Sequence, residues 1–590
     1  MAAAALLLAR VPAAADEGAA EWSARYTVRF GSGARGVPRA DVEARLRWLG
    51  PPRRRPATLT VGMADDGFPK GYGAFVRAFR DTGPRATGAP PAPGASGGYV
   101  LTVSAGGAVS FAYSVVLEHD ASGWGPGPDE APYRFDTGVF WTGRALFVTA
   151  PRSRAEVTFT PPAGDRFFTS FAPGKRARTY VVPDDQRLRD SFLVVGRPAA
   201  AGLSVGPARI ELVMGGGLEA SLPLVKDSLA QFLEAAAALF GGAPPARILV
   251  VGTAGGRHGS FDGGVFGDDV SLRVDEPFGA ANASRWRPFL AHELFHLWNG
   301  RALDYEGQQY WISEGFTDYY ARVLLARLGQ QPAPDFVADL EGRAARVLSG
   351  RADVGLLAAG DAKFENTALV YDGGMLAALC LDLQVRAASG NRRSLDDVMR
   401  ALYAGHAGPP PRPVAPGAVL AALAAAAGAP FDDFFARHVS GHEPLPLAAS
   451  LALAGVELEQ TSRDLLPLGW VTATLLRCPS LNAEPGVGLR VLKSRGEALR
   501  AGDVIVAVAG RPAQTFDALR AALGDVAPGT TVAVTVLRGG APAEIDVKLG
   551  EGTVPARTRV VDVTMRPAAD PSPLALEIRR GVFGSWEDRR

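Results

Sequence analysis

The chain of 590 residues is poor in cysteine and histidine and contains no long apolar run. Its two cysteines, Cys380 and Cys478, cannot form a disulfide framework, and the apolar neighbours of Cys380 predict a buried free thiol. No segment approaches about 18 consecutive apolar residues, so no membrane-spanning helix is expected. The 62 basic and 61 acidic residues nearly cancel, and this balance excludes the basic footprint of a nucleic-acid-binding protein.

The N-terminus carries a candidate signal peptide. Residues 1–15 join an alanine-rich apolar run to a small-residue cleavage site at Ala13–Ala15, although a positively charged start is missing. We therefore expect a chain that is exported, either to the periplasm or to the medium. The alternative is a cytoplasmic chain that begins with an alanine-rich segment.

The spacing of apolar residues changes along the rest of the chain, whose length predicts about three to five domains. Residues 22–200 contain segments that alternate at period two, which predicts an N-terminal β-sandwich-like domain. Residues 201–445 form the next predicted domain, in which the spacing of apolar residues becomes helical from about residue 222. Strand patterns return in residues 446–550, and residues 551–590 form a C-terminal tail without a clear pattern. The predicted fold class is multidomain α+β.

Residues 485–550 resemble a PDZ domain. The segment Gly486-Val487-Gly488-Leu489 is a glycine-containing loop that leads into a strand, and a turn, a strand, a short helix and another strand follow. The resemblance implies that this loop presents backbone N–H groups to the carboxylate of a C-terminal peptide, while an edge strand accepts the peptide. The alternative is a small β domain that only packs against the rest of the chain.

Two histidines four residues apart mark the most informative segment. On a helix, His292 and His296 lie on one face and can offer imidazole nitrogens to one ion. Glu293, beside the first histidine, can reach a water on that ion. Ser284 is placed to cap this helix and Gly300 to end it.

A third ligand is needed, because catalytic zinc usually takes three protein ligands and keeps one position for water. Glu314 is the candidate, 18 positions after His296 in a second helical segment. Asp318, one turn further, is placed to accept the free N–H of a zinc-bound histidine. These side chains predict one Zn²⁺ per chain. Glu293 is the predicted general base, which takes a proton from the water that hydrolyses the peptide bond.

The segments His292–Asn299 and Trp311–Tyr320 closely resemble the glycyl aminopeptidase family of gluzincin metallopeptidases. The resemblance implies an N-terminal β domain, a mostly helical thermolysin-like catalytic domain and a C-terminal PDZ domain. It also implies an aminopeptidase for peptide substrates with small N-terminal residues such as Gly or Ala. Asn299, just after the second histidine, becomes a candidate to support the metal ligands.

The same resemblance suggests a donor for the oxyanion that forms when a peptide bond is attacked. Related aminopeptidases place a tyrosine just before a Lys-Gly pair at the start of a helix. Tyr371 matches this tyrosine, whereas Asp372 and Gly373 depart from the expected neighbours. We expect the Tyr371 hydroxyl to donate to the oxyanion, and a core tyrosine near a helix start is the alternative.

The sequence departs from the family pattern at the residue that binds the amine of the substrate. The family carries a Gly-Gly-x-Glu motif whose glutamate binds the free α-amine of the substrate. The corresponding stretch here is Gly263-Gly264-Val265-Phe266, so Phe266 replaces the glutamate. The candidate substitutes for its charge are Asp262, Asp268 and Asp269. An endopeptidase, or a peptidase of altered specificity, is therefore one alternative. A catalytically inactive, PDZ-bearing binding protein is another.

Overall fold

The computed structural model describes residues 20–33, 36–63, 71–83, 98–118, 132–244, 246–254, 261–274, 278–350, 353–408, 412–484, 486–584 and 586. The candidate signal peptide, residues 1–15, lies outside them. The internal contacts of the chain divide it into one unit that ends at Asp304 and another that begins at Tyr305. Within the described residues, every helix is too short or too polar to span a membrane.

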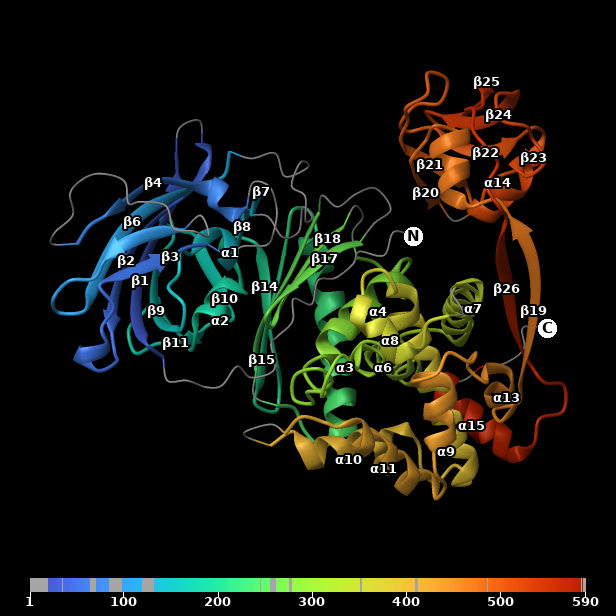
Figure 1. Cartoon of the computed structure of the whole chain (residues 1–590), viewed down its shortest axis with the longest axis horizontal. Helices are drawn as coiled ribbons and strands as arrows, with labels where there is room; N and C mark the ends of the chain where they lie inside the picture. The colour runs from blue at the N-terminus through green and yellow to red at the C-terminus, as the bar shows by residue number, and fades with distance from the viewer. Residues whose placement is uncertain are drawn as a thin grey trace. The chain divides into compact units, whose positions relative to one another are not determined.

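The first unit opens with a β-rich region, as its alternating segments predict (Figure 1). Seven strands pair in the order β11-β12-β9-β1-β2-β6-β4, and four pair in the order β10-β13-β8-β7. The inward-facing side chains of the two sheets share one apolar cluster, to which Tyr26, Phe111, Trp141 and Leu193 belong. This shared core is the sandwich-like arrangement that alternating strands produce when each sheet buries one face.

The elements of this region are β1 (Trp22–Ser32), β2 (Pro38–Trp48), η2 (Pro52–Arg54), β3 (Thr58–Val61), η3 (Tyr72–Phe75), β4 (Val76–Asp81), β5 (Tyr99–Thr102), β6 (Ala108–Val116), β7 (Tyr133–Phe135), β8 (Gly138–Thr142), α1 (Gly143–Leu146), β9 (Ser153–Thr160), β10 (Arg166–Thr169), β11 (Ala172–Pro173), β12 (Thr179–Val182), α2 (Asp185–Arg189) and β13 (Phe192–Gly196). Strands β3 and β5 pair separately from the two sheets.

A five-stranded sheet completes the first unit, in the order β14-β15-β16-β18-β17. Strands β15, β16 and β18 are parallel, and the two outer strands run antiparallel to their neighbours. Helix α3 ends where Gly241 adopts a left-handed φ of 78°, a frequent helix C-terminus. The elements are β14 (Ala199–Val205), β15 (Ala208–Gly215), η5 (Glu219–Ser221), α3 (Leu222–Phe240), β16 (Arg247–Ala254), β17 (Phe261–Phe266), β18 (Asp269–Val274) and α4 (Ala283–Phe295).

The second unit is helical over its first half. Helix α9 is buried along most of its length, and Cys380 within it is a buried free thiol, as its apolar neighbours predict. The elements are α5 (Tyr310–Ser313), α6 (Gly315–Arg327), α7 (Ala333–Ser349), α8 (Leu356–Ala359), η6 (Gly360–Ala362), η7 (Leu369–Gly373), α9 (Gly374–Ala388), α10 (Leu395–His406), α11 (Pro416–Ala427), α12 (Asp432–Phe434), η8 (Phe435–Val439) and α13 (Leu447–Ala452).

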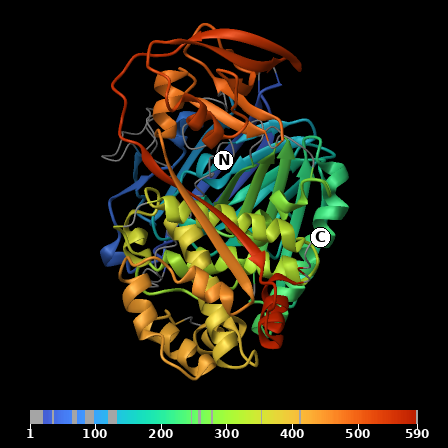
Figure 2. The same ribbon diagram turned by 90° about the vertical axis from the view of Figure 1, so that its right-hand side faces the viewer.

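The second half of this unit is a small β module joined to a two-stranded ribbon. The ribbon strands β19 (Val456–Leu465) and β26 (Thr558–Pro567) pair antiparallel along their whole length (Figures 1 and 2). The module between them has its own apolar core, from Leu466 to Leu549. Its elements are η9 (Trp470–Leu475), β20 (Ser480–Glu484), β21 (Gly488–Lys493), β22 (Val504–Val508), β23 (Arg511–Pro512), α14 (Phe516–Leu523), β24 (Thr531–Arg538) and β25 (Ala541–Lys548).

The C-terminal segment, for which the sequence shows no clear pattern, contains regular secondary structure. It supplies β26 and helix α15 (Pro573–Phe583). The ring of Phe583 lies 5.6 Å from that of Phe336 on α7, and the carbonyl of Gly581 accepts a hydrogen bond from Arg327 on α6. The expected tail is therefore part of the packed second unit.

Candidate metal centre

The two predicted histidine ligands lie on successive turns at the end of α4. Their Nε2 atoms are 3.1 Å apart, and both side chains are buried, with exposures of 8% and 4%. The other nitrogen of His296, Nδ1, lies 2.9 Å from the backbone oxygen of Asn299. An N–H···O=C bond at Nδ1 fixes the ring so that Nε2 faces the metal position. The backbone carbonyl of Asn299 thus contacts the predicted ligand His296, and its support of a bound metal stays a prediction.

The end of α4 is shaped by Gly300. Its φ is +110°, and a Cβ built on it would approach His296 Nδ1 to 3.2 Å. Both the left-handed backbone and the close approach favour glycine. The start of the helix differs from the prediction: Ser284 lies inside α4, because the carbonyl of Asn282 already accepts the N–H of Arg285.

The third predicted ligand, Glu314, immediately precedes α6 and has no exposed surface. One ligand atom each from His292, His296 and Glu314 lies within 4.8 Å of the others. Gly315, the next residue, has no room for a side chain, because a Cβ would meet the backbone of Gly374 at 2.4 Å. This close contact places the ends of α6 and α9 against each other.

The three side chains fit a zinc ion. Two nitrogens at about 2.05 Å from a tetrahedral zinc stand about 3.3 Å apart, and the observed separation is 3.1 Å. Two imidazoles and one carboxylate are a common donor set of catalytic zinc, which leaves a fourth position for water. Glu293, the predicted general base, follows His292 directly and is buried with it. The donor set therefore supports the zinc prediction.

Lys363 is a residue of this centre that the sequence analysis did not identify. Its Nζ donates to Glu314 Oε1 at 2.7 Å across 49 positions of sequence. The same Nζ lies 4.6 Å from the ring centre of Tyr310 and 5.2 Å from that of Tyr371. No motif surrounds this lysine, which follows the short helical turn η6, so no sequence signal could have assigned it to the site.

Asp318 lies one turn into α6, as predicted, and has two arginine partners. Its Oδ1 accepts from Arg322 Nη1 at 2.8 Å, and its Oδ2 accepts from Arg343 Nη1 at 2.8 Å. A carboxylate oxygen can accept more than one hydrogen bond. The expected bond from a zinc-bound histidine to Asp318 stays a prediction, and the arginine pairs are an addition to it.

Tyr371 lies in η7, a π-helical turn that leads into α9. Asp372 follows Tyr371, at a position where the family pattern has a different residue. It accepts hydrogen bonds from Arg343 and Arg346 of α7 at 2.7 Å each. The departure thus serves to join η7 to α7. The role of the Tyr371 hydroxyl at an oxyanion stays a prediction.

Phe266 belongs to the interior of the first unit. Its ring stacks on Phe192 at 4.8 Å, the guanidinium of Arg144 lies 4.0 Å from its centre, and its exposure is 1%. Gly263 on the same strand approaches Phe289 of α4. Because neighbouring side chains of a strand alternate between its two faces, Phe266 lies on the opposite face of β17 from Gly263 and the helix. Substrate binding by Gly263, Gly264 and Phe266 stays a prediction, and the ring of Phe266 packs in the apolar core of this unit.

Two of the three candidate substitutes for the missing glutamate, Asp268 and Asp269, have partners in the first unit. Asp268 forms an ion pair with Arg301. Asp269 is fully buried and accepts hydrogen bonds from Ser170 and from the backbone N–H groups of Phe192 and Leu249. Burial raises the pKa of Asp269, although Arg187 and these donors oppose the shift. The side chain of Asp262 lies outside the described residues.

The predicted carboxylate loop of the β module forms a tight turn between β20 and β21. Gly486 has a φ of +74°, and the Val487 N–H donates to the carbonyl of Glu484 at 3.0 Å. Gly488 pairs with Glu484 in the β20–β21 ladder, and Leu489 is buried in the core of the module. Peptide binding by these four residues stays a prediction, and the turn uses the N–H of Val487 internally.

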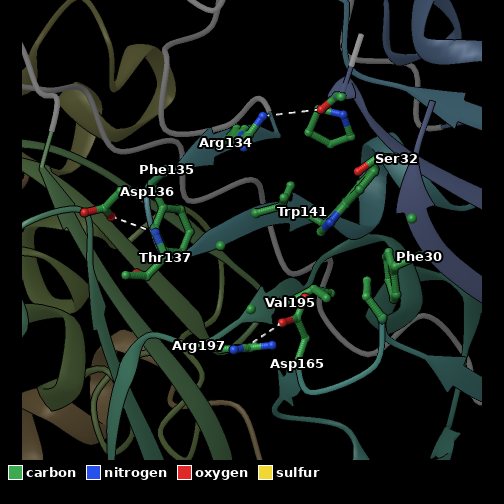
Figure 3. A pocket seen from close by; sticks show the side chains of 17 residues that line it. Phe30, Ser32, Arg134, Phe135, Asp136, Thr137, Trp141, Asp165, Val195 and Arg197 are labelled. Carbon is green, nitrogen blue, oxygen red and sulfur yellow. Dashed lines mark hydrogen bonds and ion pairs between the residues drawn. The ribbon is translucent and has the colours of Figure 1, made fainter. Parts of the chain in front are cut away.

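A hollow of about 420 Å³ opens among β1, β8 and β13 of the first unit (Figure 3). Its charged groups have hydrogen-bond partners within the first unit: Arg197 donates to Asp165 at 3.1 Å, Arg134 donates to the carbonyl of Gly36 at 3.3 Å, and Asp136 accepts from the backbone N–H of Thr137. The residues predicted for the metal centre and for the peptide loop are not among those that line it. The hollow is therefore separate from the predicted chemistry.

Comparison with known proteins bears on both halves of the chain. Residues 285–356 match the M61 glycyl aminopeptidase family model, and residues 492–549 match the PDZ domain model. The periplasmic pH-dependent serine endoprotease DegQ of Escherichia coli (strain K12) is 30% identical over 116 residues. That stretch is 19% of this chain and 26% of the relative, so the chain spans about a quarter of the relative's length.

Two solved structures are also similar. An aminopeptidase N family protein from Idiomarina loihiensis is 17% identical, with a TM-score of 0.64 over 95% of this chain and 100% of its own, which shows a shared fold. An M1 zinc metallopeptidase from Deinococcus radiodurans is 18% identical, with a TM-score of 0.44 over 72% of this chain and 94% of its own. The latter score is too low to support a conclusion. Residues 285–356 are thus similar to the M61 glycyl aminopeptidase family, and residues 492–549 are similar to PDZ domains.

Proposed function

We propose that the protein is a zinc-dependent metallopeptidase. The observation that carries the proposal is the buried set of His292, His296 and Glu314, whose ligand atoms converge within 4.8 Å. When bound there, zinc lowers the pKa of a water to about 7 and polarises a carbonyl. A binding protein with no catalytic role would not require Glu293 beside the first ligand, and Glu293 is present and buried.

The side chains of the centre divide the chemistry of hydrolysis among them. Glu293 takes a proton from the attacking water and returns it to the leaving amine. The Tyr371 hydroxyl donates a hydrogen bond to the oxyanion that develops on the scissile carbonyl. Asn299 holds His296 in the orientation that presents Nε2. Each role uses a group whose ordinary chemistry suits it.

A Glu293→Gln variant tests the proposal. Zinc content should equal that of the wild type, because a residue outside the ligand set is changed, while hydrolysis of a peptide mixture should fall about 10²- to 10⁴-fold. Glu234→Gln on the exposed face of α3 is the matched control and should change neither. Bound zinc without any hydrolysis that depends on Glu293 would favour the inactive, PDZ-bearing binding protein instead.

The family suggests an aminopeptidase that prefers small N-terminal residues such as Gly or Ala. A second candidate, an endopeptidase or a peptidase of altered specificity, is favoured by the burial of Phe266 and by the internal partners of Asp268 and Asp269. Cleavage of a Gly- or Ala-anilide is to be compared with cleavage of an N-acetylated peptide. A strong preference for the free amine would support the aminopeptidase, and equal rates would support the endopeptidase.

The remaining proposals concern partner and location. We propose that the PDZ domain binds C-terminal peptide tails, and binding of a labelled peptide library to the whole chain would test this. Export rests on residues 1–15, and one relative is named as a periplasmic enzyme. Removal of these residues from the mature protein, seen by mass spectrometry of an expressed chain, would support export.

A further inference from the structure

We propose that Lys363 is a positioning residue of the metal centre, which balances the charge of Glu314 and holds one of its carboxylate oxygens while the other binds the metal. The inference rests on the proposed zinc site and adds a residue to it. Its starting point is the 2.7 Å contact between Lys363 Nζ and Glu314 Oε1.

The ion pair between Lys363 and Glu314 is buried, which makes the loss of either partner costly in free energy. The exposures of the two side chains are 8% for Lys363 and 0% for Glu314. A charge taken out of water is costly unless it is paired, and removing one partner of a buried pair leaves the other uncompensated. In the metal-free chain, Lys363 therefore supplies the positive charge that Glu314 requires.

The ammonium also contacts the faces of two tyrosines. Its Nζ lies within 6 Å of the ring centres of Tyr310 and Tyr371, at 4.6 and 5.2 Å, which is the range of a cation–π contact. Tyr310 begins α5, Glu314 precedes α6, and Tyr371 lies in η7. One side chain thus connects a metal ligand with the tyrosine proposed to bind the oxyanion.

This arrangement has a consequence for metal binding. Without the ammonium, the buried carboxylate of the metal-free chain loses this cationic partner, whereas in the zinc-loaded chain the metal itself offsets that loss. Neutralising Lys363 therefore destabilises the metal-free form more than the loaded form. By linkage, the folded variant then binds zinc more tightly than the wild type. A lysine with a merely structural role would destabilise both forms equally.

The test compares Lys363→Met with Lys363→Arg in the full-length chain. Zinc affinity is measured by competition with a chelator, and thermal unfolding is followed with and without zinc. We expect Lys363→Met to bind zinc at least about tenfold more tightly and to show a larger zinc-induced shift in Tm. Lys363→Arg keeps the charge and should stay within about twofold of the wild type. Lys363→Gln, which is neutral but polar, should follow Lys363→Met and replaces it if that variant does not fold.

Arg386→Met provides a matched control. Arg386 and Asp382 form another buried pair, at 2.9 Å, with exposures of 8% and 1%, and neither is a candidate ligand. This variant should lose stability while its zinc affinity stays within about twofold of the wild type. Unchanged or weaker zinc binding in Lys363→Met, or equal behaviour of the arginine and neutral variants, would overturn the inference.

The readout separates this inference from the proposed function. Zinc binding is measured without any peptide, so a wild-type chain that binds zinc but hydrolyses nothing refutes the peptidase proposal alone. A wild-type chain that binds no zinc refutes both proposals. A wild-type chain that binds zinc and hydrolyses peptides, with Lys363 variants that do not alter affinity, refutes only the role of Lys363.

Discussion

Tyr371 is the residue whose side-chain chemistry can be separated most cleanly from metal binding. It lies in a π-helical turn, a local widening that often occurs at functional sites. Replacing it by phenylalanine removes only the hydroxyl. We predict that Tyr371→Phe loses about 10²- to 10³-fold in turnover, with zinc affinity and KM little changed. Peptide hydrolysis kinetics and zinc titration measure the three quantities.

A control for this variant is Tyr403→Phe, on the partly exposed face of α10, which should change none of them. Wild-type turnover in Tyr371→Phe would assign the oxyanion to another donor. The expected effect rests on one hydrogen bond that is stronger in the transition state than in the bound substrate.

At the scale of single residues, the sequence predicts those neighbours that are fixed by spacing along a helix. Residues four apart on a helix must share a face, so His292 and His296 follow from their positions. Lys363 has no such constraint, because it reaches Glu314 only through tertiary packing over 49 positions. Phe266 is a case in which position in a motif is not enough. It stands at the glutamate position of a family motif, but the alternation of side chains along the strand places its ring in the apolar core. Motif matching identifies positions and does not determine side-chain direction.

At the scale of elements, α6, α7 and η7 are joined by alternating charges, most of them buried. Arg343 on α7 donates to Asp318 of α6 at 2.8 Å, to Asp372 of η7 at 2.7 Å and to Asp339 of its own helix at 3.1 Å. The element that follows Glu314 and the element that carries Tyr371 are thus attached to the same guanidinium. The sequence could not predict this network, because α7 contributes no motif.

We predict that Arg343→Met costs about 3 kcal/mol or more of unfolding free energy at pH 7, since it leaves carboxylates buried without their shared cation. Burial alone would raise the pKa of Asp339, but Arg322 and Arg343 outweigh it and lower that pKa. A carboxyl with a lowered folded pKa stabilises above its unfolded pKa of about 3.9, and this contribution is lost as the pH falls further. The destabilisation should therefore shrink between pH 7 and pH 3.

Denaturant unfolding at both pH values measures this difference. Arg346→Met is the matched control: Arg346 also contacts Asp372, but it is 45% exposed, so its loss should cost less than about 1 kcal/mol. A cost for Arg343→Met that is the same at both pH values would show that packing, and not charge, dominates at this position.

At the scale of the whole molecule, the PDZ domain is inserted at the tip of a hairpin. Strands β19 and β26 pair from Val456↔Pro567 to Leu465↔Thr558, so the ends of the insertion lie opposite each other. The apolar core of the insertion, Leu466 to Leu549, lies within residues 466–557. The ribbon itself is attached to α7, where Ser349 and Glu341 accept backbone N–H groups of β26. The order of domains was predictable from pattern changes, whereas the return of the last strand and helix to the catalytic region was not.

This topology predicts different outcomes for two deletions. Replacing residues 466–557 by Asn-Gly, which favours a two-residue hairpin turn, keeps the ribbon and α15 and should preserve zinc binding and hydrolysis of short peptides. Ending the chain after residue 557 removes β26 and α15. This exposes the partner strand β19 and the ring of Phe336, which packs against Phe583, and should lower Tm or abolish folding. Thermal unfolding and zinc content distinguish the two chains. Equal loss in both would mean that the PDZ domain itself stabilises the catalytic region, because only that domain is missing from the first chain.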